Sequence, residues 1–75
     1  MIINNDVRPK ETIFYISAVI YKILRVASMD TTQLYSRVDN EIADKLDYSV
    51  FLLSIDFLFL LNKINVNNKG ELTCI

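Results

Sequence analysis

The sequence predicts a single, mainly α-helical domain that ends in a β-hairpin, in the order α-α-α-β-β. Apolar residues recur at three- and four-residue steps through the first half of the chain. A helix-length block from Val50 to Leu61 follows, and its only polar side chains are Ser54 and Asp56. The chain then alternates between apolar and polar residues around its only glycine, Gly70. Three helices and a closing hairpin are the elements of a winged helix-turn-helix domain.

The first predicted helix runs from about residue 10 to residue 28. Residues 1–9 are expected to form a flexible lead, and residues 10–75 the winged-helix-like domain. Pro9 suits the first turn of a helix, where its missing N–H group costs no hydrogen bond. The apolar stripe that we expect to face the core consists of Ile13, Phe14, Ile16, Val19, Ile20, Ile23, Leu24 and Ala27.

The second predicted helix covers residues 31 to 44 and has a narrow apolar face. Asp30, Thr31 or Thr32 can cap it by accepting a hydrogen bond from a free backbone N–H group. The buried face is expected to consist of residues at a strict four-residue spacing, Leu34, Val38 and Ile42, with Tyr35 alongside. A short additional strand between the first two helices is compatible with the sequence.

The third predicted helix begins at a cap, Asp47 or Ser49, and ends at about Asn62. At 100° per residue its apolar residues fall on two sides: one with Leu52, Ile55, Leu58 and Phe59, the other with Leu53, Phe57, Leu60 and Leu61. A helix that is apolar all round is either central to a core or covered on a second side by another molecule. A domain of 75 residues has too little protein to cover both sides.

The C-terminal hairpin is predicted from alternation on both sides of a turn. Ile64 and Val66 alternate with asparagines, and Leu72 and Cys74 alternate with polar residues on the return strand. Gly70 lies in the turn between them, where a positive φ angle is expected.

Composition argues against an enzyme and against metal or cofactor binding. The chain has no histidine, and its single cysteine, Cys74, has no partner for a disulfide or a Cys/His metal site. One glycine cannot form a phosphate-binding loop. The net charge is −1, and no apolar run reaches the roughly 20 residues of a membrane span. We therefore expect a soluble cytoplasmic protein without catalytic, cofactor-binding or metal-binding residues.

The third helix also lacks the side chains that contact bases. Winged helices that bind DNA place Arg, Lys, Asn or Gln in this helix, and residues 48–61 contain none of the four. Lys63 and Lys69 could contact phosphates weakly, together with Arg37 and Lys45. Because of these possible phosphate contacts, a small DNA-binding transcriptional regulator is the alternative hypothesis. Sequence-specific binding is not expected, because the third helix lacks side chains that contact bases.

Protein binding is the function that the apolar surface favours. An exposed apolar patch marks an interface, and tyrosines often anchor one. The predicted interface residues are Tyr15, Tyr21, Leu53, Asp56, Phe57 and Leu60. Asp56 has two interpretations: a solvent-facing break in the apolar helix, or a carboxylate that meets a basic residue of the partner. A homodimer through the same patch is a further hypothesis, and both kinds of contact can coexist.

The chain resembles the small middle component 6 proteins of bacterial ABC-three-component systems. The resemblance covers roughly residues 10 to 73 and includes the segments ETIFYISAVIYKILR and TTQLYSRVDNEI. Its most specific part is FLLSIDFLFLLNKINVNNKGEL, which is similar to the family pattern F-L-x-A-L-D-F-L-Y-L-L-G-K-I followed by a short wing. The chain departs from that pattern at Ser54 and Ile55, where Ala and Leu are usual, and at Asn62, where Gly is usual.

This resemblance implies an accessory subunit that works beside an SMC-like or Rad50-like ABC ATPase and a third, effector-type component. Such systems look like anti-phage or mobile-element defence modules similar to the Lamassu group. The small subunit would then be a winged-helix adaptor that binds the ATPase or bridges it to the effector. The resemblance supplies no catalytic residues.

Overall fold

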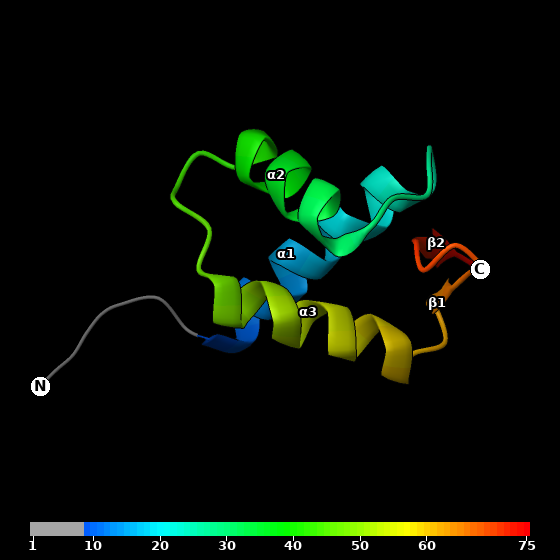
Figure 1. Ribbon diagram of the computed structural model, residues 1–75. Helices are drawn as coiled ribbons and strands as arrows, with labels where there is room; N and C mark the ends of the chain where they lie inside the picture. Colours follow the sequence, from blue (N-terminus) through cyan, green and yellow to red (C-terminus); the bar gives the residue numbers. More distant parts are fainter. Residues whose placement is uncertain (1–8) are drawn as a thin grey trace, which may run out of the picture.

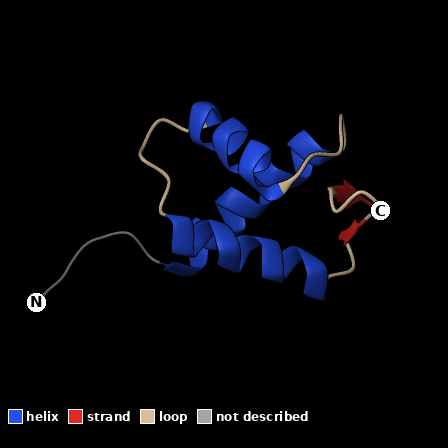
Figure 2. Ribbon diagram, viewed as in Figure 1, coloured by secondary structure: helices blue, strands red, loops and turns tan. Residues whose placement is uncertain are grey.

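Three helices and a two-stranded antiparallel sheet make up the structure, a computed structural model that describes residues 9–75, with side chains from Thr12 onward (Figure 1). The elements are α1 (Pro9–Leu24), α2 (Thr31–Glu41), α3 (Tyr48–Leu60), β1 (Ile64–Val66) and β2 (Leu72–Cys74). The predicted order and fold class are confirmed (Figure 2). Of the predicted lead 1–9, only Pro9 lies among the described residues, as the first residue of α1.

Aspartates cap the second and third helices, and each was one of the cap candidates in the sequence. The Asp30 carboxylate accepts a hydrogen bond from the Gln33 N–H group at 2.8 Å, and the Gln33 side chain accepts one from the Asp30 N–H group. This capping box identifies Asp30 as the cap of α2 among the three candidates. Asp47 caps α3, since its carboxylate accepts from the N–H groups of Ser49 and Val50.

All three helices end earlier than predicted. The α1 helix ends at Leu24 instead of about residue 28, because the chain turns there to bring Met29 against the hairpin. The α2 helix ends at Glu41 instead of residue 44, because Ile42 is extended, with φ −94° and ψ 154°. The α3 helix ends at Leu60, two residues before the predicted Asn62.

The end of α3 is a Schellman motif centred on Asn62. Asn62 has a φ of 59°, in the left-handed region that favours glycine. Its N–H group donates to the Phe59 carbonyl, and the Lys63 N–H group donates to the Leu58 carbonyl, both at 3.0 Å. This geometry explains why the position that holds Gly in the resembled pattern holds Asn here, since Asn tolerates a positive φ better than most residues.

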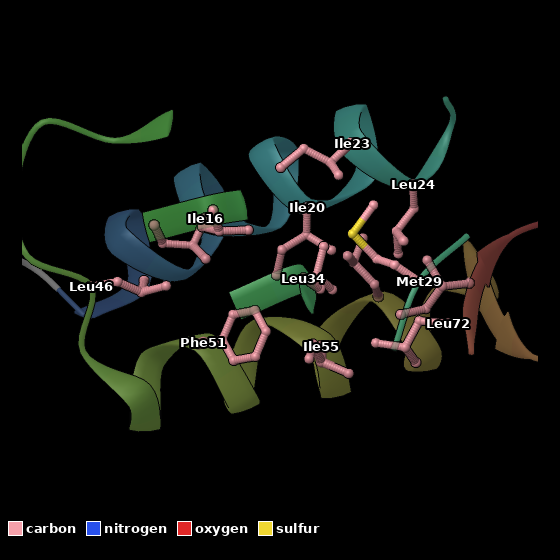
Figure 3. Packing of buried hydrophobic residues seen from close by; sticks show 13 residues of the cluster. Ile16, Ile20, Ile23, Leu24, Met29, Leu34, Leu46, Phe51, Ile55 and Leu72 are labelled. Atoms are coloured by element: carbon pink, nitrogen blue, oxygen red, sulfur yellow. The ribbon is translucent and has the colours of Figure 1, made fainter. Parts of the chain in front are cut away.

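The core lies where the three helices and the hairpin meet. Figure 3 shows Phe51 extending from α3 toward the labelled residues Ile20 of α1 and Leu34 of α2. Ile55 belongs to the same buried cluster. Four of the predicted stripe residues of α1 and two of α2 are buried. The buried apolar residues are Ile16, Ile20, Ile23, Leu24, Met29, Leu34, Val38, Leu46, Phe51, Ile55, Leu58, Ile64 and Leu72.

The sequence assigned several residues to the wrong environment. Ala27 and Phe14 were expected in the core, but both are exposed, because α1 ends before Ala27 and Phe14 lies on the opposite side of α1 from Ile16. Leu52 was placed on the same side of the third helix as Ile55 and Leu58, but those two are buried and Leu52 is 40% exposed. Phe51 is fully buried at the centre of the core and was not predicted there.

Two buried serines let α1 and α3 pack closely. The Ser54 hydroxyl donates to the Val50 carbonyl of its own helix at 2.8 Å and to the Ile13 carbonyl of α1 at 3.3 Å. The Ser17 hydroxyl donates to the Ser54 carbonyl at 3.4 Å. Both hydroxyls are therefore satisfied although both residues are buried. Small side chains at this crossing bring the two helix backbones together.

The hairpin has its strands and turn where the sequence predicted them. Ile64 pairs with Cys74 and Val66 with Leu72, and Gly70 in the turn has a φ of 79°. The Asn67 side chain organises the turn by accepting hydrogen bonds from the N–H groups of Lys69 and Glu71, both at 2.9 Å. The predicted extra strand between the first two helices is present as a single bridge from Met29 to Leu72.

Candidate protein-binding site

The α3 helix turns one apolar side into the core and leaves another in solvent. Phe51, Ile55 and Leu58 are buried, whereas Leu53 is 52% exposed and Leu60 is 82% exposed. At 100° per residue these two leucines lie on the side of the helix opposite the three buried residues. Figure 1 shows α3 along an edge of the molecule, with α2 on one side of it.

The outer side of α3 carries a continuous row of side chains, which we call the α3 stripe: Leu52, Leu53, Asp56 and Leu60. All three leucines are exposed, Leu60 the most and Leu52 the least. Residues three and four apart are neighbours on a helix surface. Asp56 therefore lies between Leu53 and Leu60 on the same face. The predicted interface residues Leu53, Asp56 and Leu60 are thus brought together.

Asp56 has no partner on this surface. No hydrogen bond or ion pair joins its carboxylate to any of the side chains that the structure describes, from Thr12 onward, and it is exposed. An ion pair elsewhere, between Lys22 and Glu41 at 3.1 Å, joins α1 to the end of α2. The only charge on the stripe is therefore an uncompensated negative one.

Phe57 extends the stripe toward α1. Its ring is half-buried and packs against the ring of Phe14, with 5.3 Å between the centroids. Phe14 itself is 50% exposed, so the pair forms an aromatic edge beside the α3 stripe. Phe14 was expected in the core. Ala18 and Tyr21 follow Phe14 by four and seven residues, so all three lie on one face of α1. This face points away from Ile16 and Ile20. The spacing is therefore the signal in the sequence that Phe14 lies on the outer side of α1.

The two predicted tyrosines do not join the α3 stripe or each other. Tyr15 is 56% exposed and lines a groove of about 650 Å³ between the start of α1 and the α2–α3 loop. Tyr21 is half-buried against the hairpin, and Arg25 lies 5.8 Å from its ring centroid. A hydrogen bond with the Cys74 side chain, together with the charge of that group, raises the pKa of Tyr21.

The basic residues named for nucleic-acid contact do not form one surface. Lys63 follows the end of α3 and Lys69 lies in the hairpin turn, and both are exposed. Lys45 lies in the α2–α3 loop, and this loop and the hairpin are at opposite ends of the molecule in Figure 1. Arg37 lies on α2. A phosphate backbone could not contact both ends through one continuous basic face.

Neither a metal site nor a membrane-spanning helix is found within the described range. No group of three or more His, Cys, Asp or Glu side chains in residues 9–75 is placed to hold a metal ion. None of the helices described is both long enough and apolar enough to cross a bilayer. The exposed apolar surface of α3 is the feature that calls for a functional explanation.

Comparison with known families agrees with this architecture. The family described as ABC-three component (ABC-3C) system Middle Component 6 matches residues 3–75, almost the whole chain. The chain belongs to this family. A middle component is one part of a system of several components, so this protein works alongside others. Searches of curated proteins and of solved structures find no match, so the winged-helix assignment of this Middle Component 6 protein stays a prediction.

Proposed function

We propose that this Middle Component 6 protein is a non-enzymatic adaptor of its ABC-three-component system and binds another subunit through the α3 stripe. The observation that supports this proposal is that α3 has large apolar side chains on two sides and the rest of the domain covers only one of these sides. Burying apolar surface gives roughly 25 cal/mol per Å², so a partner that covers these leucines gains binding free energy.

The proposed partner is the SMC-like or Rad50-like ABC ATPase of the system, or the effector that the adaptor bridges to it. Family membership supports a partner from the same system. The anti-phage defence role and the cytoplasmic location are parts of this proposal that rest on the family resemblance. No side chain of the described residues is proposed to act in catalysis.

Copurification of the tagged chain with the other two components tests this proposal. Leu60→Asp places a charge at an 82% exposed site and should abolish copurification without unfolding the domain, because the side chain contributes little to the core. Val26→Asp is the matched control, since Val26 is 84% exposed and lies outside the α3 stripe. Wild-type binding by Leu60→Asp would show that the α3 stripe is not the interface.

Phage challenge of cells that carry the complete system tests the defence role separately. Cells with the Val26→Asp subunit should resist phage as wild-type cells do, and cells with Leu60→Asp should lose protection. Full protection in the complete absence of the subunit would remove the defence role from the proposal.

The DNA-binding regulator is the less favoured function, because the basic residues lie at opposite ends and Asp56 would repel phosphate. Binding through phosphates would weaken steeply as salt is raised. We expect no binding of the chain to duplex DNA even at low salt. A steep salt dependence would favour the regulator.

A further inference from the structure

We infer that Asp56 restricts the partner to an apolar helical surface that carries one Arg or Lys, and that it disfavours a second copy of this chain. This inference rests on the proposed docking role of the α3 stripe and names the chemistry of its partner. It follows from the position of one uncompensated charge among three exposed leucines.

A partner that covers the leucines must also cover Asp56. Leu53 precedes it by three residues and Leu60 follows it by four, so the carboxylate lies inside the apolar surface and not at its rim. No described residue neutralises it. Removing a carboxylate from water without a counter-charge is strongly unfavourable. The partner must therefore supply a cation at this point, and the guanidinium of Arg also forms two parallel hydrogen bonds with a carboxylate.

The remainder of the partner surface must be apolar and elongated. The α3 stripe covers about two turns of a straight helix, with leucines at both ends and the charge near the middle. A second helix lying along it would match this layout if aliphatic residues flank its Arg or Lys by three or four positions. An amphipathic helix from another subunit has this chemistry.

A second copy of the chain does not fit the α3 stripe. In an antiparallel pair that sets Leu52 of one copy against Leu60 of the other, residue numbers of facing positions sum to 112, so Asp56 faces Asp56. A parallel two-fold pair also sets Asp56 against itself. Like charges facing each other in an interface oppose association.

Lys63, the basic residue nearest to Asp56 in the sequence, does not correct this mismatch. Lys63 lies seven residues after Asp56, and an antiparallel pair that joins these two sets Leu53 of one copy against Val66 of the other, in β1. The leucines at the start of the α3 stripe would then lie opposite the hairpin, beyond the end of the partner's α3. The charge pattern therefore favours a different protein as the occupant.

Self-association of the chain alone tests the first half of the inference. Sedimentation velocity should show a monomer for wild type, and Asp56→Leu should self-associate at least about tenfold more tightly, because it completes the apolar face. Adding Leu60→Asp to Asp56→Leu should restore the monomer. A wild-type dimer that Leu60→Asp dissociates, or an Asp56→Leu chain that stays as monomeric as wild type, would overturn this half.

Charge reversal in the complex tests the second half. Asp56→Lys should weaken binding to the coexpressed ATPase and effector components by at least about tenfold relative to wild type, because two cations would meet in the interface. Asp44→Lys, an equal change at an exposed position in the α2–α3 loop, should bind as wild type. If Leu60→Asp abolishes the complex while Asp56→Lys leaves it intact, this inference fails and the docking role stands. If Leu60→Asp has no effect, the docking role itself fails.

Discussion

The inner and outer sides of α3 carry similar side chains in opposite environments. Phe51 and Ile55 on the inner side are at most 7% exposed, whereas Leu53 and Leu60 on the outer side are at least 52% exposed. The first pair stabilises the fold, because α1 and α2 pack over it. The second pair contributes little to folding and is available to a partner. Apolar composition alone therefore does not distinguish core residues from interface residues in this helix.

Truncating one aromatic side chain on the inner side should have the largest effect. Phe51→Ala should reduce the free energy of unfolding by about 3–5 kcal/mol, because it removes a fully buried ring and leaves a cavity. That is a large share of the roughly 4–11 kcal/mol available to a domain of this size. Leu53→Ala, on the outer side, should change it by no more than about 0.5 kcal/mol. Urea unfolding followed by circular dichroism measures both, and equal losses would contradict the two-sided description.

Enlarging a small side chain should also affect stability differently on the inner and outer sides of α3, with a smaller change in the free energy of unfolding. Ser54 is fully buried at the crossing of α1 and α3, so Ser54→Leu should cost about 1–3 kcal/mol by forcing the helices apart. Ser49→Leu makes the same change at an exposed position of α3 and should stay within about 0.5 kcal/mol of wild type. A tolerated Ser54→Leu, measured by the same unfolding assay, would mean that the crossing is looser than described.

The sequence predicted the elements of the fold better than the sides of α3. Element order, the Asp47 cap and the turn at Gly70 follow from local signals, and all three are present. The predicted helices were too long at their C-terminal ends. Tertiary contacts such as the Met29–Leu72 bridge end α1 although its apolar pattern continues. No local signal ranks Phe51 above Leu52, since both continue an unbroken apolar run.

The candidate site was also predictable only in part, because local patterns are visible in the sequence and tertiary packing is not. An excess of apolar residues on α3 identified the helix and placed Leu53, Asp56 and Leu60 together. Tyr15 and Tyr21 were grouped with them because both flank the core stripe of α1. They flank it on different edges, one beside the α2–α3 loop and the other beside the hairpin. Only the packing of α1 among its neighbours distinguishes these edges.

Asp47 and Asp56 of the third helix should differ in their contribution to stability, as the inner and outer sides of the helix do. Asp47 caps α3 through two backbone N–H groups, so Asp47→Ala should lower the free energy of unfolding by about 1 kcal/mol. Asp56 has no partner in the described part of the chain, and Asp56→Ala should change it by less than about 0.5 kcal/mol, since Ala favours helix. Thermal unfolding of both variants measures the difference. A cost at Asp56 equal to that at Asp47 would point to a structural role for that carboxylate.

The smallest predicted change in the free energy of unfolding concerns Asn62, the residue at which the chain leaves α3. The position of this residue determines how far the inner and outer sides of the helix extend. Asn62 has a φ of 59°, and Asn62→Gly should stabilise the domain by a few tenths of a kcal/mol, up to about 1, because glycine adopts this conformation without steric cost. Asn62→Ala should destabilise it by about 1 kcal/mol, because a Cβ atom without a compensating polar group is strained there. Opposite shifts in the urea midpoint of the two variants would show that the left-handed turn ends the helix. The reverse order, with Asn62→Ala more stable than Asn62→Gly, would indicate that α3 continues past Leu60, because Ala favours a helix interior and Gly disfavours it.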